Sequence, residues 1–63
     1  MTMQPYRFYF LGSDDHIKAV EVIDCADDAA AKQKAEALLH ERNGFAAIEV
    51  WREKDMVHQV RRA

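Results

Sequence analysis

The chain has 63 residues and a formal net charge of −2, and hydrophobic residues make up 49% of it. This length allows one domain, residues 1–63, and this hydrophobic content argues against a disordered chain. A single cysteine cannot form an intramolecular disulfide, so a secreted fold held by disulfides is not expected. Domains this small bury only about 60% of their unfolded surface, and oligomerisation is a common source of further burial.

The N-terminal segment shows neither a signal-peptide pattern nor a membrane span, because its apolar run, residues 6–11, is short and contains Arg7. We therefore expect a cytoplasmic protein without membrane contact. The charge is unevenly distributed, with six acidic residues within 14–28 and four basic residues within 52–62. Such asymmetry can orient a dimer or steer a partner, whereas the acidic balance disfavours nucleic-acid binding.

Two strands are predicted in the first part of the chain. Residues 6–11 are rich in aromatic side chains, which fit a pleated, half-buried surface. Alternation places Tyr6, Phe8 and Phe10 on one face, and Arg7, Tyr9 and Leu11 on the other. Residues 12–16 are turn formers, and residues 17–23 are rich in β-branched side chains, so the two strands should form a hairpin.

A helix is predicted next, over residues 29–42. Asp27 is a good N-cap, and Asp28 adds a charge that favours the helix dipole. Gly44 suits the left-handed position that commonly ends a helix. The apolar stripe of this helix consists of Ala31, Ala35, Leu38 and Leu39.

The second hairpin is predicted from residues 45–51 and 56–60, joined by the polar turn 52–55, with residues 61–63 as a frayed tail. Two hairpins around one helix predict an α+β fold of ββαββ type. A right-handed crossover is satisfied by a four-stranded antiparallel sheet in the order 2-1-3-4, with the helix on one face.

One helix can cover only one face of such a sheet. We place Phe8, Phe10, Ile48 and Val50 on the helix side. A four-residue loop at 52–55 would put Glu49 opposite His58 and Trp51 opposite Met56, and would bring Val60 to the uncovered side. The candidate interface or ligand patch on that side consists of Arg7, Tyr9, Leu11, Glu49, Trp51, Met56 and His58, with Ala47 among them. An apolar patch of this kind usually marks an interaction site.

No catalytic, metal or cofactor site is predicted. Cys25 precedes a helix, but neighbouring aspartates oppose thiolate formation, and a buried structural residue is the favoured interpretation. His16, His40 and His58 have no metal-type spacing. No nucleophile and base can be paired from the sequence, so we do not expect an enzyme.

Residues 6–10, 24–28 and 49–51 resemble the corresponding segments of a group of short uncharacterised bacterial proteins. The resemblance covers nearly the whole chain and implies the same fold, but it carries no activity. Residues 25–28, with the spaced Ala31, Ala35 and Leu38, also resemble HicB-type antitoxins at the level of fold. The chain lacks that family's proline- and glycine-containing approach to the helix and has no recognisable DNA-binding segment.

Two functions follow as hypotheses. The first is a non-enzymatic interaction module that homodimerises, or binds a protein partner, through the apolar sheet face. The alternative is a small-ligand-binding or regulatory domain with an aromatic pocket around Tyr9 and Trp51, in which Arg7 or His58 fixes a polar group.

Overall fold

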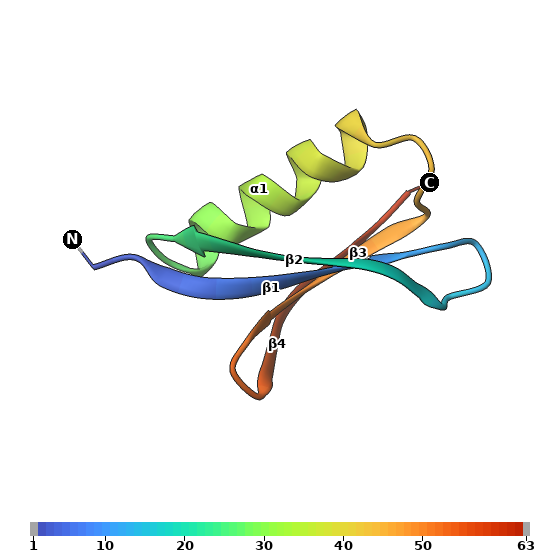
Figure 1. Ribbon diagram of the computed structural model, residues 1–63. Helices are drawn as coiled ribbons and strands as arrows, with labels where there is room; N and C mark the ends of the chain where they lie inside the picture. Colours follow the sequence, from blue (N-terminus) through green and yellow to red (C-terminus); the bar gives the residue numbers. More distant parts are fainter. Residues whose placement is uncertain (1, 63) are drawn as a thin grey trace.

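The structure is a computed structural model that describes residues 2–62. Its elements are β1 (Gln4–Leu11), β2 (Ile17–Cys25), α1 (Asp28–Glu41), β3 (Ala47–Arg52) and β4 (Asp55–Arg61). The four strands form one antiparallel sheet in the order β2-β1-β3-β4, and α1 lies along one face of it (Figure 1). The predicted ββαββ arrangement and strand order are therefore confirmed.

The core lies between the helix and the sheet. The side chains of Phe8, Phe10, Ile48 and Val50 are fully buried, as predicted for the helix side. The predicted stripe of the helix, from Ala31 to Leu39, packs against them. Small alanines at two of these positions let the helix backbone approach the sheet closely.

The start of the helix is tied to the sheet by side chains. Asp27 is the N-cap, as predicted, and its carboxylate accepts from the backbone N–H of Ala30 at 2.8 Å. Asp28 accepts from the buried Tyr6 hydroxyl at 2.8 Å and from the Arg52 guanidinium at 2.9 Å. Burial, together with the hydrogen bond to Asp28, raises the pKa of Tyr6. Asp28 therefore joins α1 to β1 and β3, beyond its favourable position on the helix dipole.

The end of the helix differs from the prediction. Gly44 does not have a positive φ, so it is not a left-handed terminator. Instead, the Arg62 guanidinium donates to the carbonyl oxygens of Leu39 and Arg42, and also to that of Phe45. The backbone N–H of Arg62 also donates to Ala46 at 2.8 Å. The prediction of a frayed tail was wrong for 61 and 62, because β4 continues through 61 and Arg62 caps the helix; Ala63 lies outside the described residues.

The last hairpin also corrects the predicted register. Arg52 pairs with Asp55, so the loop has two residues, and Glu53 adopts a positive φ of 55° within it. Trp51 pairs with Met56 as predicted, but Val50 pairs with His58. A β-bulge therefore inserts one extra residue, Val57, into β4.

A single inserted residue moves every later side chain to the opposite face of a strand. His58 and Val60 were predicted on the uncovered face, and both predictions were wrong. His58 lies on the helix side, with Nε2 at 3.9 Å from the Glu36 carboxylate, and Val60 packs against the core. The third strand also starts later than predicted, at Ala47, and Phe45 before it packs on Phe10 with ring centroids 5.1 Å apart.

Candidate functional site

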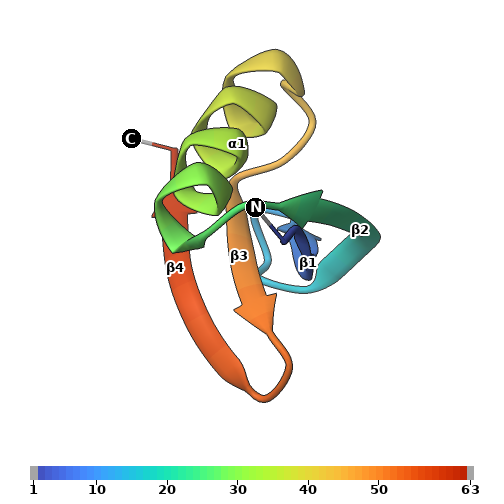
Figure 2. The ribbon, with the colours of Figure 1, turned by 90° about the vertical axis from the view of Figure 1, so that its left-hand side faces the viewer.

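The sheet face that α1 leaves uncovered, here called the open face, is the candidate site. The strand registers place the following residues on it: Ile17, Val20 and Val22 of β2; Arg7, Tyr9 and Leu11 of β1; Ala47, Glu49 and Trp51 of β3; and Met56, Gln59 and Arg61 of β4. Two views at right angles show the helix on one side of the sheet and, among residues 2–62, no element over the other (Figures 1 and 2).

The open face exposes large apolar side chains. The exposed fractions are 55% for Ile17, 50% for Val20, 63% for Val22 and 46% for Met56. The first three lie on β2, which is an outer strand of the sheet, and Met56 lies on β4, which is the other (Figure 2). Exposed apolar residues are common singly, but a group on one face indicates an interaction surface.

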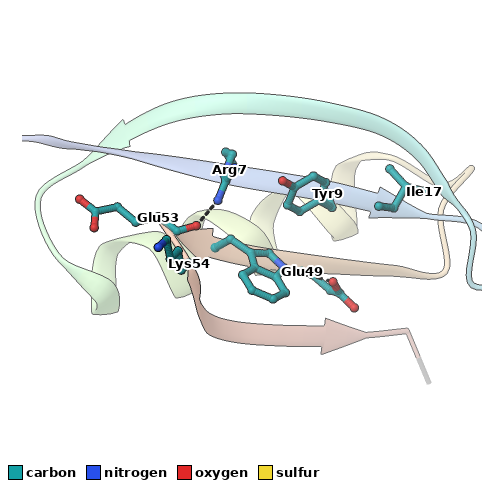
Figure 3. Close-up of a pocket in the computed structure, with 7 residues that line it drawn as sticks. Arg7, Tyr9, Ile17, Glu49, Glu53 and Lys54 are labelled. Atoms are coloured by element: carbon teal, nitrogen blue, oxygen red, sulfur yellow. Dashed lines mark hydrogen bonds between the residues drawn. The ribbon is translucent and has the colours of Figure 1, made fainter.

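A hollow of about 400 Å³ lies in the open face, over β1 and β3. The hollow is shallow and open to solvent, and its surface is mostly apolar. Its lining residues are Arg7, Tyr9, Ile17, Glu49, Trp51, Glu53 and Lys54 (Figure 3). Three strands and the β3–β4 turn thus meet around a depression of the size that small-molecule sites have.

Two aromatic rings form the floor of the hollow. Tyr9 and Trp51 are both half-buried and meet edge to face, with centroids 6.5 Å apart and planes at 86°. This arrangement is favourable, because the positive edge of one ring meets the negative face of the other. The Trp51 indole N–H donates to Glu49 at 3.2 Å, which fixes the orientation of the indole.

Charged groups stand at the rim. The Arg7 guanidinium lies 5.9 Å from the Tyr9 ring centroid and donates to the backbone carbonyl of Glu53 (Figure 3). Arg7 therefore joins β1 to the β3–β4 turn and holds the rim of the hollow together. Lys54 and the carboxylates of Glu49 and Glu53 complete a rim of mixed charge.

The other end of the open face is closed. Leu11 and Ala47 are buried there, although both belong to the predicted uncovered face. Arg61 is paired with Ala47 on β4, and its guanidinium reaches Asp15 in the β1–β2 turn at 3.0 Å. Both residues of this ion pair lie at the same end of the sheet as Leu11 and Ala47. Leu11 is therefore a covered residue of the face and offers no docking area.

The predicted patch is thus brought together in part. Arg7, Tyr9, Glu49 and Trp51 line the hollow, and Met56 lies on the same face beside it. Leu11 is on the face but buried, and His58 is on the opposite face.

Sequence reasoning missed the contribution of β2 to this face. Val20 and Val22 alternate with Glu21, and that alternation was available as a signal of one apolar side. The alternation could not predict the register with β1, in which Val20 pairs with Tyr9 and Val22 pairs with Arg7. Ile17 reaches the hollow because the ladder shifts register between Phe10 and Leu11.

Other candidate chemistry does not converge on the site. Cys25 is buried at the end of β2, and burial raises the pKa of its thiol. Within residues 2–62, no three His, Cys, Asp or Glu side chains come close enough together to hold a metal ion. Over the same residues, α1 is too short and polar to cross a bilayer.

No family model, curated protein or solved structure matches the chain. The resemblances to short bacterial proteins and to HicB-type antitoxins therefore stay predictions.

Proposed function

We propose that this chain is a non-enzymatic interaction module, and that its open face docks a protein surface, first of all that of a second copy. One observation carries the proposal. The large apolar side chains that the sheet leaves exposed lie on this face, beside the half-buried Tyr9 and Trp51. The helix already fills the other face, so further burial has to come from outside the chain.

The size of the domain supports self-association. Burying one Met or Val side chain contributes about 1.5–3 kcal/mol, and a 63-residue chain has few other places to gain such burial. The mixed charges at the rim suit a protein surface, since a polar rim around an apolar centre is the usual anatomy of an interface.

Met56→Lys tests this proposal. Met56 is on the open face but exposed and outside the hollow, so the substitution should leave the fold intact. Losing its burial should weaken self-association about tenfold or more. The measurement is the solution mass by sedimentation over a concentration series, with far-UV circular dichroism as the check on folding.

The matched control is Gln33→Lys, which adds the same charge at an exposed position of α1. Equal association of Met56→Lys and the wild type would refute self-association through the open face.

The hollow favours a second candidate, a small-ligand site. Its volume and aromatic floor suit an aromatic ring, and Arg7 at the rim suits a carboxylate; His58, which was predicted for this role, lies on the other face. Trp51 is the single tryptophan, so its fluorescence reports directly on the hollow. Titration with benzoate and indole-3-acetate should shift the emission of the wild type and not that of Arg7→Gln. Unchanged emission throughout would exclude aromatic carboxylates as ligands.

A further inference from the structure

The outer edge of β2 is a second surface of interest. β2 has nine residues, contains no proline, and pairs only on its β1 side (Figure 2). Outer strands normally avoid pairing with other chains by being short, by carrying proline or charged side chains, or by being broken by bulges. β2 carries Lys18, Glu21 and Asp24, so a partner strand has to match these charges. The other outer strand, β4, is interrupted by the bulge at Val57. In β2 the register shift lies at its first residues, and its pairing with β1 is regular from Ala19 to Cys25.

We infer that two copies of this chain pair edge to edge through β2, antiparallel about a two-fold axis at Glu21, to form an eight-stranded sheet. This contact uses a different surface from the open face, so either can fail alone. The axis runs perpendicular to the sheet and keeps both helices on the same side. Opposite residues must then lie on the same face of the sheet, so only a few registers are open.

The sequence of β2 is complementary to itself in this register. With Glu21 opposite its own copy, Val20 lies opposite Val22 of the second copy, and Lys18 lies opposite Asp24. The regular residues Ala19–Ile23 then pair with one another, whereas Ile17 lies beyond the register shift, on the opposite face from Cys25. Opposite charges and paired β-branched side chains are the cross-strand neighbours that stabilise sheets.

The neighbouring registers are poorer. An axis at Val20 sets Val22 opposite Lys18, and an axis at Val22 sets Val20 opposite Asp24. Both registers therefore place a valine against a charge and separate Lys18 from Asp24. Asp24 makes no ion pair within residues 2–62, so it is available to a lysine of the second copy. Lys18 holds its own Asp14 at 3.3 Å in an exposed pair, which it would have to share with or exchange for Asp24 of the second copy. Glu21 on the axis meets a like charge, but each Glu21 is neutralised by its own Arg42.

The pairing also accounts for two of the exposed apolar residues. In a single copy, Val20 and Val22 stand on an outer strand, 50% and 63% exposed. In the paired sheet they become a central cluster of four valines. The two open faces then lie side by side on the same surface, and the apolar area presented to a partner is doubled. If two such sheets also dock face to face, the assembly is a tetramer with 222 symmetry.

Disulfide cross-linking between single introduced cysteines reports directly which residues of the two β2 strands lie opposite each other. In a Cys25→Ala background, we would compare Glu21→Cys, Val20→Cys and Val22→Cys under mild oxidation on a non-reducing gel. A residue on the axis faces its own copy at a Cα separation of about 4.5–5.5 Å, within the range of a disulfide. In this register the cysteines of the other two variants lie about 7–8 Å from their own copies, at or beyond the limit of that range.

We expect a covalent dimer as the main product for Glu21→Cys and for neither of the other two variants. We also expect the solution mass of the wild type to be at least that of a dimer. Preferential cross-linking of Val20→Cys or Val22→Cys would overturn the register. A monomeric wild type without cross-linking in any variant would overturn the edge pairing itself. Adding Met56→Lys to Glu21→Cys should leave the cross-link unchanged, because Met56 is not on β2, and this separates the edge contact from the open face.

Discussion

The two faces of the sheet are built from similar side chains and have opposite surroundings. On the helix side, Phe8, Phe10, Ile48 and Val50 are completely buried beneath α1. On the open side, Tyr9 and Trp51 are half-buried, and Val22 is mostly exposed. A single helix of 14 residues accounts for the difference, since it covers one face and reaches no part of the other. The comparison shows that apolar composition alone does not define a core. Apolar residues fill the core on one face and stay partly or mostly exposed on the other.

The test with the largest expected effect on stability compares one residue from each face. Phe8→Ala removes a fully buried ring and should lower the free energy of unfolding by about 3–5 kcal/mol. Because small domains have only about 5–15 kcal/mol of stability, much of the chain should unfold. Val22→Ala should cost under about 0.5 kcal/mol, since its side chain is mostly exposed.

Urea denaturation followed by circular dichroism, at low protein concentration, gives both values. The same denaturation is then repeated at high protein concentration. If the loss of unfolding free energy caused by Val22→Ala grows with concentration, Val22 lies in an interface between copies. Equal costs for the two variants at low concentration would contradict the assignment of faces.

A test with an intermediate expected effect on stability compares two adjacent arginines. Arg62→Ala removes the donor to the carbonyls at the end of α1 and should lower stability by about 1–2 kcal/mol. Arg61→Ala removes an exposed ion pair with Asp15 across the open side, which should cost less than about 1 kcal/mol. Thermal unfolding of the two variants ranks them. The reverse order would mean that the Arg61–Asp15 ion pair stabilises the chain more than the helix cap does.

The smallest effect concerns thiol chemistry. The thiol of Cys25 is buried and its pKa is raised by that burial, so little thiolate forms near neutral pH. Alkylation by iodoacetamide at pH 8 should be slow in the folded chain and fast in urea. Val22→Cys, in a Cys25→Ala background, places a thiol on the exposed side of the same strand and should react quickly without denaturant. Comparable rates for the two thiols in the folded state would contradict the burial of Cys25.

The sequence predicted the elements, the strand order and the helix side of the sheet. It could do so because periods of two and of about 3.6 are local properties, and because Asp27 and residues 12–16 mark their boundaries. The strand pairs that place Phe8 beside Val50 and Phe10 beside Ile48 follow once the order is known.

The errors come from features without a local signal. The bulge at Val57 is one residue that breaks the period of β4, and nothing in residues 52–60 marks it. Its consequence was a candidate site containing His58, on the wrong face. The sequence places Arg62 in a frayed tail because its partners, Leu39 and Arg42, are 20 or more residues away in sequence. Leu11 is likewise buried at an end of the face where Asp15 and Arg61 form an ion pair, and these two residues are 46 positions apart in sequence.

The cap supplied by Arg62 has a consequence for the order of events in the cell. A ribosome produces α1 well before it produces residue 62, so the helix emerges with its last carbonyls unsatisfied by the chain. Those groups acquire their partner only when β4 has been made and has docked beside β3. Completion of the helix is thus coupled to the end of translation of this segment, and we expect nascent chains that stop within β4 to carry a frayed helix and an incomplete core.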